Sequence, residues 1–133
     1  MKSELKATET DRGTLVSLPG DVLFDFNKST IRPDARPTLD KLAQLLKVQN
    51  PGSVAIEGHS DNKGNDAYNK RLSDARALAV RDYLISVQTV DGTKLTTTGF
   101  GELKPVVPNM KPDGTDDEGG RQRNRRVEVV LSK

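Results

Sequence analysis

Two stretches of the chain repeat their hydrophobic residues with the period of an α-helix. The first predicts a helix over residues 33–48, in which the apolar side chains recur at i, i+3, i+4 and i+7 and are Leu39, Leu42, Ala43 and Leu46. Asn50-Pro51-Gly52 supplies the stop for this helix. The second stretch predicts a helix that Asn65 caps and that runs to about Val87.

Short runs of β-branched and aliphatic residues precede, separate and follow these helices. Four of them predict strands, at residues 14–18, 54–59, 95–100 and 126–131. A further short apolar piece at residues 22–26 is expected to be extended. Residues 1–13 are charged without a clear period, which predicts a linker or lead-in. The long segment from Lys104 to about Arg123 is rich in proline, glycine and aspartate and is expected to be a functional or mobile loop.

The order of these elements is β-α-β-α-β-β, which predicts an α+β fold of two layers. We expect a mixed sheet of about four strands with the two long helices packed on it. Crossover helices imply that part of the sheet is parallel, and the last two strands suggest an antiparallel pair at its edge. A chain of 133 residues with 33% hydrophobic residues suits one such domain, whose bounds we place at residues 14–133.

One charged residue interrupts the apolar face of the second helix. Arg76 lies four residues after Leu72 and four before Val80, and so it shares their face. The other members of this face are Ala75, Ala79, Tyr83, Leu84 and Val87. A guanidinium stays protonated, and burying it without a partner is costly. We therefore expect Arg76 to reach the edge of the sheet, to meet a carboxylate or to hold an anionic ligand.

Asp61 is the candidate partner of Arg76, because it stands at the junction between a strand and the second helix. Loops that follow the strands of such sheets are the usual place for ligands. One interpretation is an internal ion pair that fixes this loop. The other is a divided site, in which Asp61 takes an ammonium group and Arg76 takes a carboxylate. The local sequence leaves both interpretations open.

Composition and charge exclude several classes of function. Lysine and arginine total 21 against 19 acidic residues, a net charge of +2 that argues against a general nucleic-acid binder. The aromatic content is 4%, with no tryptophan, which leaves few platforms for stacking bases or sugars. The chain has no cysteine, so disulfides and thiol chemistry are impossible. It also has no apolar run near the roughly 20 residues that a membrane helix needs, so we expect no direct insertion into a membrane.

The motifs of enzymes, metal sites and cofactor sites are also missing. His59 is the only histidine, too few for a zinc hydrolase or a catalytic triad, and a hydrogen-bonded structural role is expected for it. The acidic residues at 113–118 fail the spacing of a calcium-binding loop, and no nucleotide fingerprint occurs. We therefore expect a binding protein rather than an enzyme, without metal or cofactor.

Several separated motifs resemble one known family. Residues 57–84 read EGHSDNKGNDAYNKRLSDARALAVRDYL and are similar to the signature of the OmpA-like C-terminal domain, which OmpA, Pal-type lipoproteins and the flagellar stator protein MotB share. The resemblance continues upstream at residues 23–35 and downstream at 97–105 and 120–131. It covers residues 14–131, with the motifs in the family's order.

The resemblance implies the same β-α-β-α-β-β fold and a function in the cell envelope. It implies non-catalytic binding of the diaminopimelate residue in the peptidoglycan stem peptide, which anchors an envelope protein to the cell wall. The site residues that it implies are Asp61, Arg76, Asn69, Asp25, Phe26, Arg125 and Arg126.

The roles of these residues follow from the family pattern. Asp61 and Arg76 match the binding pair, and Asn69 matches a residue that lines the pocket. The segment 24–26 matches a loop that covers the ligand. Arg125 and Arg126 match a pattern at the start of the last strand, of which at least one arginine is expected near the site. Two departures are Ser60, where many relatives have threonine, and the long acidic loop at 109–120.

The resemblance also bears on localisation and partners. The polar start of the chain is similar to the edge of an excised domain, so we expect a periplasmic domain of a longer membrane-anchored protein, with an outer-membrane parent favoured. Peptidoglycan is the expected partner. The alternative is a protein-interaction module of the envelope, with weak or no binding of peptidoglycan.

Overall fold

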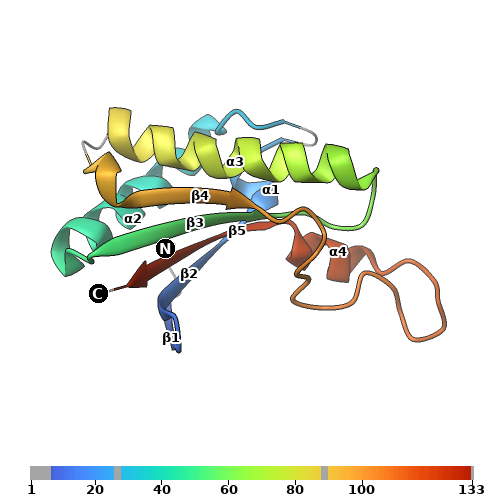
Figure 1. Cartoon of the computed structure of the whole chain (residues 1–133). Coiled ribbons are helices and arrows are strands. Elements are labelled where there is room, and N and C mark those ends of the chain that lie inside the picture. The colour runs from blue at the N-terminus through green and yellow to red at the C-terminus, as the bar shows by residue number, and fades with distance from the viewer. Residues whose placement is uncertain (1–6, 26–27, 88–89, 133) are drawn as a thin grey trace.

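A single sheet organises the chain. The computed structural model describes residues 7–25, 28–87 and 90–132. Its five strands are β1 (Ala7–Thr10), β2 (Gly13–Pro19), β3 (Ser53–His59), β4 (Leu95–Gly99) and β5 (Arg126–Ser132), in the spatial order β1-β2-β5-β3-β4. The β3–β4 pair is parallel and all other pairs are antiparallel (Figure 1). The predicted α+β class with a mixed sheet is confirmed.

Two details of the predicted sheet are wrong. The sheet has five strands rather than about four, because Ala7–Thr10 of the expected lead-in pairs with β2. The last two strands do not form an edge pair, since β5 lies between β2 and β3. Five of the seven residues of β5 are buried, which agrees with its central place between two neighbouring strands.

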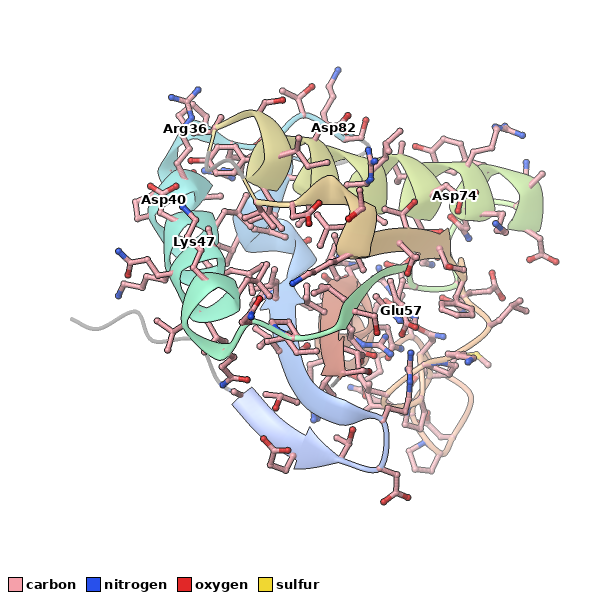
Figure 2. The ribbon with its side chains drawn as sticks, turned by 60° about the vertical axis from the view of Figure 1, so that its left-hand side comes forward. Arg36, Asp40, Lys47, Glu57, Asp74 and Asp82 are labelled. Atoms are coloured by element: carbon pink, nitrogen blue, oxygen red, sulfur yellow. The ribbon has the colours of Figure 1, made fainter. Side chains whose placement is uncertain are left out.

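The two long helices cover one side of this sheet (Figure 1). They are α2 (Arg36–Gln49), preceded by the short 3₁₀ helix η1 (Pro33–Ala35), and α3 (Asp66–Ser86). The predicted apolar stripe of the first helix is confirmed, because Leu39, Leu42, Ala43 and Leu46 are its buried residues. Figure 2 shows Arg36 and Lys47 of α2 on the side away from the sheet.

The second helix begins as predicted, but its buried face is rotated. The Asn65 side chain accepts a hydrogen bond from the Tyr68 N–H at 2.7 Å, which confirms Asn65 as the N-cap. Val87, predicted to be apolar and inward, is exposed, and Leu72 is only half-buried. The residues of α3 that are buried are Asn69, Ser73, Arg76, Ala77, Val80 and Leu84.

Glycines in the sheet explain this rotation. A Cβ on Gly58 would lie 2.2 Å from the Ser73 carbonyl oxygen, and one on Gly99 would lie 2.6 Å from Ser73 Oγ. The helix therefore approaches β3 and β4 so closely that only a small side chain fits between them. Ser73 meets this need and also accepts a hydrogen bond from the Gly101 N–H at 2.9 Å.

Two segments that were expected to lack helices contain short ones. Residues 22 and 23 of the predicted extended piece belong to the short helix α1 (Gly20–Leu23). Phe24, which follows the helix, is extended and forms a β-bridge with Ile31. The expected loop from Lys104 ends in α4 (Glu118–Asn124), which Asp117 caps by accepting from the Gly120 N–H. A further 3₁₀ helix, η2 (Gly92–Lys94), precedes β4. Among the described residues, no helix combines the length and the apolar character needed to cross a bilayer.

Candidate functional site

A cavity of about 670 Å³ opens where β3 and β5 meet the short helices. Its walls come from four parts of the chain: α1 with the residues after it, the loop after β3, the first half of α3, and α4. The residues that line it are Asp21, Phe24, Asp25, Arg32, Ser60, Asp61, Lys63, Gly64, Tyr68, Asn69, Leu72, Arg76, Glu118, Arg121 and Arg125. The structure thus brings Asp25, Asp61, Asn69, Arg76 and Arg125 of the predicted site together.

Asp61 lines this cavity with only 7% of its surface exposed. Its Oδ2 accepts hydrogen bonds from Arg125 Nη1 at 2.7 Å and from Arg121 Nη1 at 3.4 Å. Its Oδ1 accepts one from the Lys63 N–H at 3.0 Å, which fixes the loop after β3. Since each carboxylate oxygen has two lone pairs, Asp61 has room to accept from a further donor.

Arg76 is the other buried charge of the cavity, and its surface is 6% exposed. Its Nε donates to the Lys28 carbonyl at 2.8 Å and its Nη2 to the Asp25 carbonyl at 3.2 Å. The guanidinium carbon lies 4.9 Å from the centre of the Phe24 ring. Burial lowers the pKa of Arg76, because the charged form has lost part of its hydration.

The internal ion pair considered for Asp61 and Arg76 is absent, although both residues are described. Asp61 pairs with Arg121 and Arg125 instead, and Arg76 holds two carbonyls of the segment after α1. The two residues nevertheless line the same cavity, and the charge of Asp61 is among those that act on Arg76. Arg76 is therefore a buried cation that no carboxylate among the described residues pairs with.

Arg121 and Arg125 connect the walls of the cavity. Arg125 donates to both carboxylate oxygens of Asp21, at 3.0 and 2.9 Å, while its Nη1 holds Asp61. Arg121 donates to both oxygens of Asp116, at 2.7 and 2.9 Å. The hydrogen bond with Asp21 raises the pKa of Arg125, and the one with Asp116 raises the pKa of Arg121. Both arginines therefore stay charged in the cavity.

Two further predicted residues, Asn69 and Asp25, support the walls of the cavity. Asn69 donates from Nδ2 to the Asp61 carbonyl at 3.4 Å and to Glu102 at 3.3 Å, so it supports the Asp61 loop. Asp25 contributes its carbonyl to Arg76, and its carboxylate pairs with Arg32 at 3.2 Å. Phe26 lies outside the described residues.

Arg126 is not brought to the cavity. It lies at the first position of β5 and donates to Glu128 at 2.7 Å, to the Asn124 carbonyl at 3.2 Å and to the Lys104 carbonyl at 2.9 Å. Neighbouring residues of a strand point to opposite faces, so Arg125 and Arg126 diverge where the strand begins. Arg126 therefore supports the start of β5 rather than the cavity.

A second polar cluster lies on the strands, and it contains the only histidine of the chain. Ligand atoms of Glu57 (Figure 2), His59 and Glu128 lie within 4.8 Å of one another. Both carboxylates already have cationic partners, since Arg12 pairs with Glu57 and Arg126 with Glu128. A metal ion there would meet these guanidinium charges, so the cluster fits a structural network better than a metal site.

His59 departs from its predicted hydrogen-bonded role. Neither ring nitrogen has a hydrogen-bond partner among the described residues, and the ring is stacked on Phe100 with the centroids 5.3 Å apart. Burial, together with the charge of Arg126, lowers the pKa of His59 to about 4, although Glu128 acts in the opposite direction. The ring is therefore neutral at physiological pH, and its role is packing.

The sequence interpretation missed Arg121 and its acidic partners as part of the site. Arg121 and Arg125 are four residues apart, a spacing that places two side chains on one face of a helix. Because a loop is the expectation for this segment, the spacing alone predicts no shared face. Asp21 and Glu118 carried no such signal, since their place in the cavity depends on the tertiary fold.

Comparison with known proteins agrees with this architecture. The model of the OmpA family matches residues 23–124. The chain is 41% identical to outer membrane porin F of Pseudomonas aeruginosa over 111 residues, which cover 84% of the chain and 30% of the porin. It is 38% identical to outer membrane protein A of Bordetella avium, covering 84% of the chain and 54% of that protein. It is also 43% identical to the photosystem I P700 chlorophyll a apoprotein A2 of Gloeobacter violaceus, covering 97% of the chain and 15% of the apoprotein.

The chain thus spans between 15% and 54% of the length of these relatives. Among solved structures, a MotB-like protein from Desulfovibrio vulgaris superposes with a TM-score of 0.83 at 28% identity, covering 96% of the chain and 78% of that protein. The cell wall anchor of the T6SS from Pseudomonas aeruginosa has a TM-score of 0.78 at 31% identity, covering 97% and 88%. The peptidoglycan-associated lipoprotein of Burkholderia pseudomallei has a TM-score of 0.71 at 29% identity, covering 87% and 89%.

Proposed function

Because the chain belongs to the OmpA family, whose OmpA-, Pal- and MotB-like domains are peptidoglycan-associated anchors of the cell envelope, we propose that it binds the diaminopimelate residue of the stem peptide. One observation carries the proposal. Arg76, a buried arginine that has no carboxylate partner among the described residues, and Asp61, a buried carboxylate, line the same open cavity.

The chemistry of diaminopimelate matches this pair. Its side chain ends in an ammonium and a carboxylate on one carbon atom. Asp61 accepts from the ammonium, and the Arg76 guanidinium donates to the carboxylate, with the charge-assisted bonds that such pairs form. Phe24, Tyr68 and Leu72 supply apolar wall for the alkyl chain between the head group and the peptide. The site thus binds both charges and the connecting chain.

The pair also gives a reason for selectivity. A stem peptide with lysine has the ammonium but not the carboxylate, so Arg76 stays without an anionic partner in the cavity. A charged group that loses its partner in a partly dry site costs about 1.5–3 kcal/mol. Stem peptides with diaminopimelate are therefore preferred over those with lysine.

Binding without catalysis makes the domain a tether. The chain offers one histidine and no cysteine, and the family's domains act as anchors. We assign the domain to the periplasm, as part of a membrane-anchored envelope protein. In this role it ties its parent to the cell wall through the stem peptide. Incubation with sacculi should release no soluble muropeptides.

Co-sedimentation with purified sacculi tests the proposal. The wild type should pellet with sacculi that contain diaminopimelate, while Asp61→Asn and Arg76→Met should stay in the supernatant. Two matched controls change the same residue types outside the cavity: Asp113→Asn in the acidic loop and Arg81→Met on α3. If both site variants are folded and pellet as the wild type does, the proposed site is wrong.

A protein-interaction module is the second candidate, and one surface favours it. Leu103, Val106 and Met110 in the segment before α4 are 76%, 49% and 52% exposed, although they are apolar. Exposed apolar residues that follow closely along one segment are compatible with a contact surface. Substituting Leu103 and Met110 with serine should abolish capture of an envelope partner but leave binding to sacculi unchanged. Loss of binding to sacculi in this variant would show that the surface belongs to the peptidoglycan site.

A further inference from the structure

Arg121 and Arg125 converge on the same two carboxylates. Both donate to Asp61 Oδ2, at 3.4 and 2.7 Å. Both also donate to Glu118, where the contact from Arg125 is 3.2 Å and the contact from Arg121 is closer. Two arginines around one carboxylate are the arrangement with which proteins recognise anionic ligands.

The two shared carboxylates differ in their exposure. The Asp61 side chain is 9% exposed, whereas that of Glu118 is 64% exposed. The arginine side chains themselves are 12% and 18% exposed for Arg121 and Arg125. Asp61 therefore holds the pair from inside the cavity, and Glu118 reaches it from the solvent side.

Each arginine keeps an acidic partner that it does not share. Asp116 holds Arg121 through both carboxylate oxygens, and Asp21 holds Arg125 in the same way. Asp61 is the buried partner that holds both guanidinium groups when Glu118 turns away, and the half-exposed Asp116 and Asp21 add to its hold. An exposed glutamate on a short helix can turn into solvent at small cost, because surface ion pairs are worth only about 0–1 kcal/mol.

We propose that Arg121 and Arg125 form a second anion subsite, which Glu118 fills in the empty site and which a further carboxylate of the stem peptide takes on binding. The inference rests on the proposed function and extends it beyond the head group of diaminopimelate. The exchange replaces one carboxylate with another, so the net charge around the arginine pair does not change.

The stem peptide has two carboxylates that suit this subsite. One is the α-carboxylate of the γ-linked glutamate next to diaminopimelate, and the other is the carboxyl terminus of the stem. Both present the same planar pair of oxygens to Arg121 and Arg125. Amidation of one carboxylate at a time distinguishes the two sources.

Isothermal titration with three synthetic stems tests the subsite. They are L-Ala-γ-D-Glu-meso-diaminopimelate and its two monoamides, at the glutamate and at the terminus. The wild type should bind one of the monoamides about fivefold more weakly than the unmodified stem. Arg121→Gln should bind all three alike, but it should still bind the unmodified stem more tightly than a fourth stem with lysine in place of diaminopimelate. Glu118→Gln should bind the unmodified stem severalfold more tightly, and the control Asp113→Asn should behave as the wild type.

The outcomes separate this inference from the proposed function. Equal affinity of the wild type for all three stems overturns the second subsite and leaves the head-group site intact. A folded Arg121→Gln variant that still binds the unmodified stem more tightly than the monoamide also overturns the second subsite. Should Arg121→Gln fail to fold, unchanged affinity in Glu118→Gln has the same meaning. Failure of the wild type to bind any stem overturns the proposed function, and the inference with it.

Discussion

Replacing Arg76 with methionine should separate binding from stability. Methionine keeps most of the side-chain length and stays compatible with α3, but it removes the charge and the donors. If Arg76 serves the ligand, the variant loses affinity with little change in the free energy of unfolding. If Arg76 mainly supports the fold, the variant is destabilised.

The size of the stability change follows from three contributions, of which two favour the buried arginine and one opposes it. The two hydrogen bonds to backbone carbonyls, of 2.8 and 3.2 Å, contribute about 1.5–3 kcal/mol each, because the donor is charged. The contact with the Phe24 ring adds about 1 kcal/mol. Against these stands the desolvation of the guanidinium, which costs several kcal/mol. Asp25 lines the open cavity, so water can replace the lost donor there, and the free energy of unfolding should change by no more than about 1 kcal/mol.

Binding should change far more than stability. Loss of the charge-assisted bonds to the ligand carboxylate should weaken affinity for a diaminopimelate stem by about 1.5–3 kcal/mol, or about 10- to 150-fold. Urea denaturation and isothermal titration measure the two quantities on the same preparation. Arg81→Met is the matched control, because Arg81 lies on the same helix and pairs only with its exposed neighbour Asp82 among the described residues.

Two results would refute the reasoning. A loss of more than about 3 kcal/mol in the free energy of unfolding would show that the carbonyl bonds of Arg76 are essential to the fold. Wild-type affinity in the folded variant would show that Arg76 does not meet the ligand.

Three further predictions concern the scaffold of the site. The pKa of His59 is about 4 in the folded protein and about 6.5 in the unfolded chain, so protonation opposes folding, and the free energy of unfolding should fall by about 2 kcal/mol from pH 8 to pH 5. In urea titrations His59→Gln should lack this part of the pH dependence. A pH dependence identical to that of the wild type would contradict the prediction. Asn124→Ala should lower the free energy of unfolding by about 2–4 kcal/mol and expose the preceding loop to proteolysis, because the fully buried amide holds that loop through four hydrogen bonds. An unchanged rate of proteolysis would count against this role of Asn124. Gly58→Ala should lower the free energy of unfolding by more than about 3 kcal/mol, because its Cβ would lie 2.2 Å from the Ser73 carbonyl oxygen. The control Gly119→Ala, whose Cβ would meet no atom nearer than 3.6 Å, should melt at a temperature close to that of the wild type.

The parts of the fold that sequence predicted well are those with a strong hydrophobic period or a clear cap. The apolar stripe of α2 and the cap of α3 at Asn65 are both confirmed. The burial of Arg76 followed from its place between Leu72 and Val80, even though the buried face of α3 is rotated from the predicted one. Packing against glycines at the sheet causes this rotation, and a single helix does not reveal it.

The elements that sequence missed have no hydrophobic signal of their own. All four residues of β1 are exposed, so this strand depends on backbone pairing with β2 and on polar contacts such as that of Thr14 with Glu9, and it buries no apolar residue. α4 contains two glycines and no large apolar residue, and its stability comes from the Asp117 cap and the buried Asn124. Tertiary contacts decide both elements, and local propensity does not predict such contacts.

The same limit applies to the candidate site. Local sequence pointed to Asp61 and Arg76 as two charges in need of partners, but it left their relation open. The structure adds that Asp61 pairs with Arg121 and Arg125. Arg125 was among the predicted site residues, but Arg121 reaches the cavity through α4, a helix that the sequence did not predict.

The most direct test of the account compares two stem peptides that differ only at the third residue, with meso-diaminopimelate in one and lysine in the other. Isothermal titration of the wild-type domain should show that the diaminopimelate stem binds at least about tenfold more tightly, because only this stem offers Arg76 a carboxylate. Equal affinities for the two stems would contradict the claim that Asp61 and Arg76 read the head group of diaminopimelate.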